Sequence, residues 1–252
     1  MKLKGKIAVI SGAGAGYGMS RGFPTVYAKE GANLVLNYYK DDPEKMARFK
    51  EELEGYGSKV VLVEGDISKP EVACRLIETA IEHFGRIDIL LNVAGISNPK
   101  LLADMTLDDW NRMLEVDLTS AFLTCKYAVP YMIKQKFGRI INLSSQIAQK
   151  GSVEHCHYGA AKAGLIGFTK SLAREVGQYN ITVNCIAPGP IETQLMGVVS
   201  PEWRKQKESE LVLPRFGDLE EILPTAVFLA AEPDGNLYTG QTLGPNLGDV
   251  MI

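Results

Sequence analysis

The sequence predicts an α/β fold in which about seven strands form a single doubly wound parallel sheet flanked by helices. Short runs rich in Val, Ile and Leu recur along the chain, and longer segments with apolar residues at helical spacing separate them. Short runs that are apolar throughout are typical of strands buried on both faces. Strand and helix in alternation indicate parallel strands joined by crossover helices. No linker or charge block divides the 252 residues, so we expect one domain over 1–252.

The apolar runs and periodic segments place the elements. We expect strands at 6–11, 33–38, 59–65, 87–92, 139–144 and 181–186. We expect helices at 43–56, 70–84, 107–134 and 158–178, several of which begin with Pro, Asp or Thr, residues that suit a helix start. The least regular stretch, about 187–218, follows the sixth strand at the edge where open α/β sheets bind ligands. We therefore expect a substrate lid near 190–215.

Composition excludes several classes of protein. A net charge of −3 and the lack of a basic cluster argue against nucleic acid as a partner. No apolar run reaches the ~18 residues that a membrane span requires, so we expect a soluble protein. Four widely separated cysteines and no signal-peptide pattern indicate a reducing, cytoplasmic setting. The run Glu154-His155-Cys156-His157 has no evident distant partner, and we expect no metal site.

A glycine cluster after the first strand is the first sign of nucleotide binding. Glycines at a strand-to-helix turn let the backbone approach a pyrophosphate, and the helix N-terminus supplies N–H donors and partial positive charge. A flexible turn also favours glycine, so the cluster alone is weak. The residues expected to face the cofactor here are Gly12, Gly16, Gly18 and Met19.

Two further segments fit the same interpretation. GDIS (65–68) ends the third strand, where Asp66 can accept from an adenine amino group beside Ile67, although a helix N-cap, for which Ser68 is well suited, is an alternative. NVAG (92–95) follows the fourth strand, and its small residues allow close approach of a flat ligand, although it could also be a plain turn. The residues expected here are Asn92, Ala94 and Gly95.

Ser145, Tyr158 and Lys162 form the candidate catalytic group. Tyr158 and Lys162 are four residues apart and so share one helical face, while Ser145 enters from the end of the fifth strand. A tyrosine is a poor base at neutral pH, but an ammonium beside it favours the phenolate. A lone Y-x-x-x-K is more often a pair on the surface of a helix than a catalytic pair, so the other motifs of the chain must decide between the two.

In chain order the sequence presents the glycine cluster, GD, NVAG, SSQ, Y-x-x-x-K and PGPIET. That order resembles the short-chain dehydrogenase/reductase family along essentially the whole chain, most of all over YGAAKAGLIGFTKSLAREVGQYNITVNCIAPGPIET (158–193). The resemblance implies a Rossmann-like fold and an NAD(P)-dependent oxidoreductase that interconverts a secondary alcohol and a ketone by hydride transfer.

The resemblance also implies roles for individual residues. Tyr158 would be the general acid/base, Lys162 would hold the nicotinamide ribose, and Ser145 would hydrogen-bond the substrate oxygen. Gln146 and His155 would be further substrate contacts. The residues expected to line the nicotinamide are Pro188, Gly189, Ile191 and Thr193. Family members commonly form homotetramers through their long helices, which here are 107–134 and 158–178.

The chain departs from the family pattern in the glycine loop. The loop reaches the next A-x-x-G boundary two residues later than usual, and we place the insertion in the loop, so that Gly18-Met19-Ser20 match the usual G-I-G. Pro24 then lies within the first helix. The missing N–H of a proline costs less stability in the first turn of a helix than deeper inside it. We expect a locally distorted phosphate loop.

Two further departures concern the site and the C-terminus. Asp117 stands where the family has a catalytic Asn; an aspartate keeps an acceptor, loses the amide donors and, if ionised, favours the ammonium of Lys162. Near the C-terminus, NLG (246–248) replaces D-G-G, with a consequence that the sequence does not reveal.

Cofactor choice rests on the residues that end the second strand. A carboxylate there binds a ribose 2′-hydroxyl and an arginine binds a 2′-phosphate; the chain offers Asn37, Tyr38, Tyr39 and Lys40. Tyr38 is expected to contact the cofactor, and the lack of a carboxylate favours NADP(H) slightly, with Lys40 or Arg21 as phosphate partners.

Two other functions remain open. One is a nucleotide-sensing module that keeps the fold but has lost turnover, a reading that Asp117 and the altered loop encourage. The other is a lyase or epimerase that uses the cofactor transiently, so that net change in NAD(P)H absorbance distinguishes it.

Overall fold

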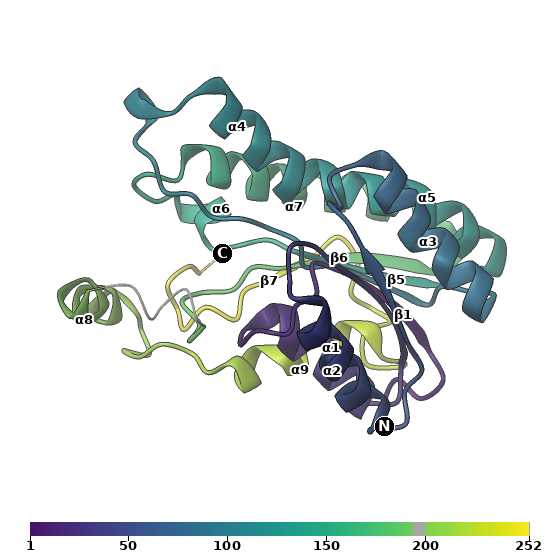
Figure 1. The fold of residues 1–252 in the computed structure, drawn as a ribbon. Helices are drawn as coiled ribbons and strands as arrows, with labels where there is room; N and C mark the ends of the chain where they lie inside the picture. The colour runs from purple at the N-terminus through teal and green to yellow at the C-terminus, as the bar shows by residue number, and fades with distance from the viewer. Residues whose placement is uncertain (194–199, 252) are drawn as a thin grey trace.

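A seven-stranded parallel sheet organises the described part of the chain, residues 1–193 and 200–251 of the computed structural model (Figure 1). The strand order is β3-β2-β1-β4-β5-β6-β7, and every pairing is parallel. The doubly wound sheet predicted from the sequence is confirmed. The strands are β1 (Ile7–Ser11), β2 (Asn33–Tyr38), β3 (Val60–Glu64), β4 (Ile89–Asn92), β5 (Gly138–Leu143), β6 (Ile181–Ile186) and β7 (Thr242–Leu243).

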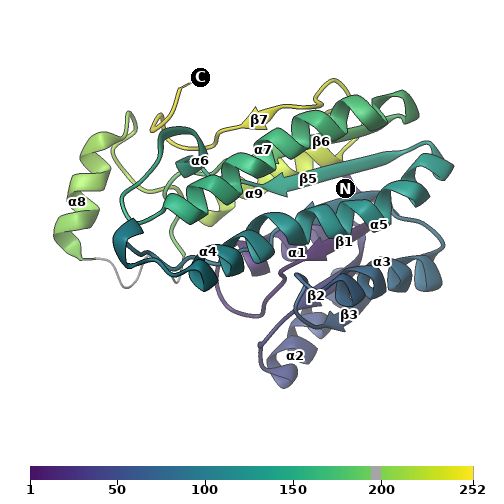
Figure 2. The ribbon, with the colours of Figure 1, turned by 90° about the horizontal axis from the view of Figure 1, so that it is seen from above.

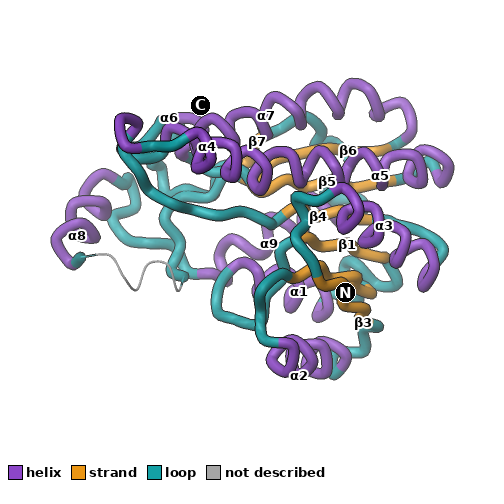
Figure 3. The backbone as a smooth tube through the Cα atoms, turned by 45° about the horizontal axis from the view of Figure 1, so that its top comes forward, coloured by secondary structure: helices purple, strands orange, loops and turns teal. Residues whose placement is uncertain are grey.

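Helices cover both faces of the sheet (Figures 1 and 3). One layer holds α1, α2 and α9, and the opposite layer holds α3, α4, α5 and α7. The helix α8 stands away from the sheet at one end of the molecule, as Figure 2 shows from above. The helices are α1 (Met19–Lys29), α2 (Pro43–Glu54), α3 (Pro70–Phe84), α4 (Leu107–Leu114), α5 (Ser120–Gln135), α6 (Ile147–Lys150), α7 (Cys156–Val176), α8 (Pro201–Glu210) and α9 (Leu219–Ala230), with 3₁₀ turns η1 (Leu102–Asp104) and η3 (Gly177–Tyr179) and a π-helical turn η2 (Glu115–Thr119).

Each face of the sheet packs its own apolar core. Alternate residues of a strand point to opposite faces, so Ala8 and Ile10 of β1 face α1, α2 and α9, while Val9 faces α3. Every residue of β1 and β5 is buried. The uniformly apolar runs in the sequence therefore reflect burial on both sides, as expected for a parallel sheet.

The order of the strands places the ligand edge. The chain passes from β3 across to β4 on the other side of β1, so the loops after β1 and β4 diverge at the carboxyl ends of neighbouring strands. Open α/β sheets bind ligands in the crevice at this switch point. The glycine cluster follows β1 and NVAG follows β4, so both motifs lie at this point.

A buried arginine fastens the opposite end of the sheet. The Arg139 side chain on β5 is fully buried, and its guanidinium donates to the carbonyls of Gly138 and Asn180 and to the Asn236 side chain at 2.7–3.1 Å. It also stacks on Phe137, 4.4 Å from the ring centroid. These contacts connect β5 to the loop before β6 and to the segment after α9.

Replacement of Arg139 by Met should destabilise the fold, because it leaves several buried acceptors without donors. We expect the free energy of unfolding to fall by roughly 2–4 kcal/mol, measured from the urea midpoint. The matched variant Arg48→Met changes an exposed arginine on α2 and should stay within about 0.5 kcal/mol of the parent. Equal losses in the two variants would contradict this role of Arg139.

Among the described residues, no helix combines the length and the apolar character needed to cross a membrane. Those residues also contain no group of three or more His, Cys, Asp or Glu side chains arranged to hold a metal ion.

Candidate active site

The ammonium of Lys162 is buried near the carboxyl edge of the sheet. Its side chain is 4% exposed, and Nζ donates 2.8 Å to the Leu143 carbonyl that ends β5. The Asp117 carboxylate lies 3.1 Å from the same Nζ. Burial disfavours the charge on Lys162, but the neighbouring Asp117 carboxylate and the Tyr158 hydroxyl group outweigh it, so the pKa of Lys162 is raised. A positive charge is therefore held at a fixed point beside Tyr158.

Asp117 reaches Lys162 from a π-helical turn. The long helix expected at 107–134 is interrupted by η2, which joins α4 to α5 and contains Asp117. Such turns inside α-helices are frequent at functional sites. The Asp117 Oδ1 accepts 2.8 Å from the Ile96 backbone N–H. A Cβ on Gly95 would lie 2.9 Å from Oδ2, so only a glycine lets the loop after β4 pass the carboxylate this closely.

Tyr158 lies in the first turn of α7, one helical turn before Lys162. The Lys162 Nζ is 5.7 Å from the Tyr158 ring centroid, and the His155 ring meets the Tyr158 ring edge-on at 5.8 Å. Tyr158 keeps partial solvent exposure. The structure thus brings Tyr158, Lys162 and His155 together, and contact of His155 with a substrate stays a prediction.

Ser145 and Gln146 follow β5 and are both buried. The Ile147 N–H donates 3.2 Å to the Ser145 Oγ, which leaves the hydroxyl proton of Ser145 to be donated elsewhere. The Gln146 backbone N–H donates 3.1 Å to the Pro188 carbonyl, which fixes the turn after β5 against the loop after β6. The Gln146 Oε1 is buried and has no hydrogen-bond partner within the described residues. Both side chains can therefore hydrogen-bond a ligand.

The loop after β1 fits a dinucleotide phosphate. Gly12 has φ 71°, and a Cβ on it would lie 2.5 Å from the Ala94 Cα, so a side chain is excluded on two grounds. The helix α1 begins after Gly18 with no side-chain cap in the described structure, and Gly16 is exposed in the loop. The Arg21 and Gly22 N–H groups donate to the Gly18 carbonyl, which leaves the N–H groups of Met19 and Ser20 for an anion.

The loop between β1 and α1 is where we place the two extra residues. The helix α1 starts at Met19 and continues through Pro24 to Lys29. Pro24 has no N–H for the Ser20 carbonyl one turn earlier, and that carbonyl instead accepts 3.1 Å from the Gly14 N–H. The enlarged loop folds back onto the helix, using an acceptor that the proline leaves free. A distortion of the loop relative to the family pattern stays a prediction.

Two predicted cofactor residues direct their side chains into the protein. The Asn92 Nδ2 donates 2.8 Å to Asn142, and its Oδ1 accepts from Thr124 at 2.7 Å. Ile67 is buried in the core on the α3 side of the sheet. Contact of these two residues with a cofactor remains a prediction that only their backbone can satisfy.

Two further predicted cofactor residues, Tyr38 and Asp66, have polar side chains that already form hydrogen bonds within the protein. The Tyr38 hydroxyl donates 3.5 Å to Glu64 at the sheet edge. Asp66 accepts from the Ser68 N–H and hydroxyl and pairs with Arg112 at 2.8 Å. The alternative role of Ser68 as a helix cap is wrong, because the cap of α3 is Lys69.

The residues expected along the nicotinamide form one continuous strip. Gly189 packs on Asn246, where a Cβ would meet the Asn246 Cα at 2.6 Å, and Ile191 bridges to Gly217. Thr193 lies 3.9 Å from the Cβ position of Gly18, so the strip returns to the start of α1. Residues 194–199 of the expected lid lie outside the described residues.

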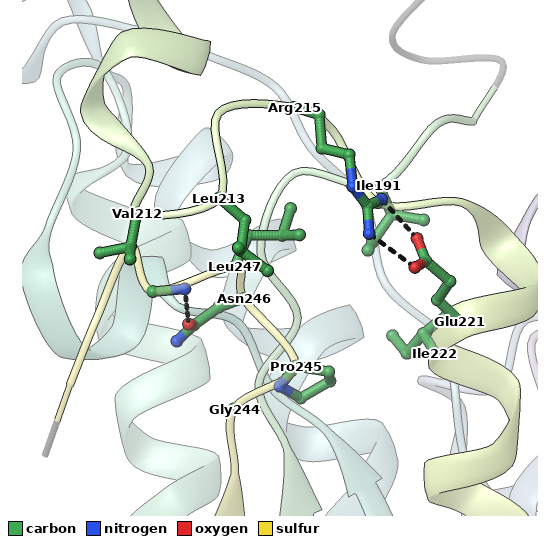
Figure 4. Close-up of a pocket in the computed structure, with 12 residues that line it drawn as sticks. Ile191, Val212, Leu213, Arg215, Glu221, Ile222, Gly244, Pro245, Asn246 and Leu247 are labelled. Atoms are coloured by element: carbon green, nitrogen blue, oxygen red, sulfur yellow. Dashed lines mark hydrogen bonds and ion pairs between the residues drawn. The ribbon is translucent and has the colours of Figure 1, made fainter.

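A cavity of about 470 Å³ lies beside this strip (Figure 4). Its wall is largely apolar, and the Arg215 guanidinium holds Glu221 through two bonds of 2.6 and 2.7 Å. That pairing lowers the pKa of Glu221 to about 2. Ser145, Tyr158 and Lys162 do not line the cavity, so we place the chemistry outside it. The apolar lining residues are Ile191, Val212, Leu213, Ile222, Pro245 and Leu247.

Sequence reasoning missed two carboxylates near the site. The Asp41 Oδ2 accepts 2.8 Å from the Ala15 N–H in the glycine loop. The side chain of Asp249 is buried and accepts from Lys150 of α6 and Lys207 of α8 at 2.6 and 2.7 Å. The adjacency of β1 and β2 could have pointed to Asp41, because it follows the end of β2 by three residues. No sequence signal pointed to Asp249.

The fold and these contacts define a dinucleotide-binding α/β oxidoreductase, with a tyrosine and a lysine on one helix and a serine after β5. The family model described as "Enoyl-(Acyl carrier protein) reductase" matches residues 12–248. The chain belongs to the short-chain dehydrogenase/reductase family.

Similar proteins match the chain over nearly its whole length. The 3-oxoacyl-[acyl-carrier-protein] reductase of Synechocystis is 36% identical over 99% of each chain, and that of Thermotoga maritima is 35% identical over 100% of each. A solved structure of a short-chain dehydrogenase/reductase from Serratia marcescens superposes with a TM-score of 0.90, at 29% identity and 99% coverage of each chain.

Replacement of Asp117 by Asn should shift the pH dependence of catalysis. The variant keeps an oxygen for the Ile96 N–H but removes the negative charge beside Lys162. The ammonium of Lys162 is then less compensated, so it stabilises the phenolate of Tyr158 more strongly. We expect the pH at half-maximal alcohol oxidation to fall by about one unit. The control Asp108→Asn removes an exposed charge on α4 and should leave the profile unchanged. Superimposable profiles for Asp117→Asn and the parent would remove any special role of this carboxylate.

Proposed function

We propose that this chain is an NAD(P)-dependent carbonyl reductase that interconverts a 3-oxo group and the corresponding secondary alcohol on an acyl thioester. The observation that carries the proposal is the buried, positively charged Lys162 beside Tyr158, with Ser145 on the neighbouring turn. The relatives named 3-oxoacyl-[acyl-carrier-protein] reductases support the choice of substrate class.

Ser145, Tyr158 and Lys162 each have a separate role in the proposed reaction. When bound, the dinucleotide supplies or accepts the hydride. Ser145 donates a hydrogen bond to the carbonyl oxygen, and Tyr158 transfers its hydroxyl proton to the same oxygen as the alcohol forms. Lys162 stabilises the phenolate that remains, and the Asp117 and Leu143 contacts hold the ammonium in place. Oxidation of the alcohol uses the same groups in reverse.

The finer choice of cofactor depends on charges near the glycine loop. The sequence predicts a slight preference for NADP(H), with Lys40 or Arg21 as partners of the 2′-phosphate. Arg21 donates to the Ala15 carbonyl and pairs with Glu52, so its charge is already compensated. Lys40 is exposed and has no ion pair among the described residues.

We also propose a homotetramer in the cytoplasm. The exposed Phe122 on α5 forms an edge-on pair with Phe168 on α7, so an apolar surface spans the two long helices expected to carry the subunit contacts. All four cysteines are free, which suits a reducing compartment. Light scattering should give four times the mass of the chain; a monomer would contradict the tetramer.

The substitution Tyr158→Phe tests the proposed chemistry. Removal of the hydroxyl eliminates the proton donor, so the rate of NAD(P)H oxidation with acetoacetyl-CoA should fall by roughly 10²–10⁴-fold. Dinucleotide binding, measured by thermal shift, should remain. The control Tyr179→Phe changes a tyrosine of η3, just beyond the C-terminal end of α7, and should keep full activity.

Three outcomes would contradict the proposal. A parent protein that binds dinucleotide without turnover on any carbonyl substrate would be a sensing module. A parent that converts substrate without net change in NAD(P)H absorbance would be a lyase or epimerase. Full activity of Tyr158→Phe would exclude Tyr158 as the acid/base.

We propose that the segment 190–215 is a substrate lid held by Asp249. Its described helix α8 contributes Lys207, α6 contributes Lys150, and the Asp249 carboxylate between them is 3% exposed. Burial disfavours the charge on Asp249, but hydrogen bonds from the two lysines outweigh it and lower the pKa of Asp249. One carboxylate thus ties the lid to the turn that follows Ser145.

The substitution Asp249→Asn should loosen the lid and leave the cofactor site intact. We expect KM for the thioester to rise by about tenfold to a hundredfold, with the dissociation constant of the dinucleotide changed less than about twofold. The control Asp234→Asn, which removes the partner of Lys2, should change neither value. An unchanged KM would contradict the role of Asp249 as a latch.

A further inference from the structure

The loop 95–100 follows β4 and passes beside the catalytic group. A Cβ on Gly95 would lie 3.3 Å from Nζ of Lys162, so the loop begins against the buried ammonium. Residues 95–99 are all exposed. The loop therefore has a face open to a ligand that lies at the catalytic group.

Two contacts that hold this loop come from the segment just before Tyr158. Nε2 of His157 lies 3.1 Å from the Asn98 carbonyl, and the Lys100 N–H donates 2.9 Å to the Glu154 carbonyl. Both contacts are to the backbone of the loop, so they fix its path. Glu154 has φ 64°, in the left-handed region that residues other than glycine rarely adopt. Such strain persists where the surrounding structure requires it, and it clusters at functional sites.

The imidazole of His157 has a single hydrogen-bond partner among the described residues. The residue is fully buried, and because a carbonyl oxygen can only accept, Nε2 carries a hydrogen and donates to Asn98. Nδ1 is buried and has no partner in the described part of the chain. An unpaired buried polar atom destabilises a fold, and an apolar side chain would avoid that loss. The Nε2–H donor is the property of His157 that an apolar side chain could not supply.

We propose that His157 is a positioning residue for the carbonyl substrate, whose Nε2–H holds the loop 95–100 as one wall of the substrate site beside Tyr158. His157 acts through the loop backbone and not on the reacting atoms, because its ring is buried. Loss of the donor frees the middle of the loop, so the substrate binds less well while the acid/base pair stays in place. The inference rests on the proposed carbonyl reductase function.

The substitution His157→Phe removes the donor and keeps a buried ring. We expect KM for acetoacetyl-CoA to rise at least about tenfold, with kcat and the dissociation constant of the dinucleotide changed less than about threefold. In His157→Gln the amide nitrogen lies as many bonds from the backbone as Nε2 does, so KM should return to within about threefold of the parent value. The matched control His83→Phe changes an exposed histidine on α3 and should change none of these values.

Hydrogen exchange of the intact protein tests the anchoring of the loop without turnover. In His157→Phe the amides of the loop 95–100 should exchange at least about tenfold faster than in the parent, while the amides of α7 keep their rates. If His157→Phe does not fold, His157→Asn takes its place with the same expected changes, because its amide nitrogen is one bond nearer the backbone and does not reach the Asn98 carbonyl.

An unchanged KM or unchanged exchange of the loop in His157→Phe would overturn the inference and leave the proposed function intact. Faster exchange throughout α7, or a parallel change of KM, kcat and dinucleotide binding that His157→Gln does not reverse, would also overturn it, because it would show a general structural role. A parent protein that turns over no carbonyl substrate would overturn both the inference and the proposed function.

Discussion

The site depends on one buried charge. An ammonium removed from water must be paired and hydrogen-bonded, since an isolated one is too costly to keep. Lys162 meets this requirement with groups from separate elements: the Asp117 carboxylate of η2 and the Leu143 carbonyl of β5. The same ammonium lies beside Tyr158. The compensation of one charge thus fixes how α7, the long helix and the end of β5 meet, and that arrangement places the acid/base.

The sheet topology supplies the second half of the site. The strand order reverses between β1 and β4, so the loops after these strands leave in opposite directions, and they are in contact where Gly12 meets Ala94. The unusual length of the first loop is accommodated by local partners. The Gly14 N–H donates to the Ser20 carbonyl, for which Pro24 has no N–H, and the Ala15 N–H donates to the Asp41 carboxylate. A departure from the family pattern that raised the question of lost function is thus a folded feature with its own contacts.

The sequence predicted the strands and the catalytic helix well, because uniformly buried strands and a four-residue spacing are visible in one dimension. Helix register also favoured the glycine loop as the place of the insertion, which stays a prediction. It could not reveal the directions of side chains. Asn92 and Tyr38 stand at the right positions, yet their polar groups bond Asn142 and Glu64.

Contacts between distant segments escaped the sequence for a different reason. Asp249 lies 99 residues beyond Lys150, and Asp41 lies 26 residues beyond Ala15, so only the fold brings them together. The π-helical turn at Asp117 was also hidden, because the apolar pattern of 107–134 continues through it. The effect of Asp117 in place of the family's Asn could not be predicted from the sequence, because it depends on the ion pair with Lys162 that the fold creates.

The central claim is that this site passes a hydride between a nicotinamide and a carbonyl carbon, with Tyr158 completing the alcohol. It is tested most directly by mass spectrometry of the product formed from acetoacetyl-CoA and a reduced dinucleotide deuterated at C4, prepared with each of the two C4 hydrogens replaced in turn. We predict that one of the two labelled cofactors places deuterium on the carbinol carbon of 3-hydroxybutyryl-CoA. Binding of the dinucleotide without label in any product, from either labelled form, would contradict the claim.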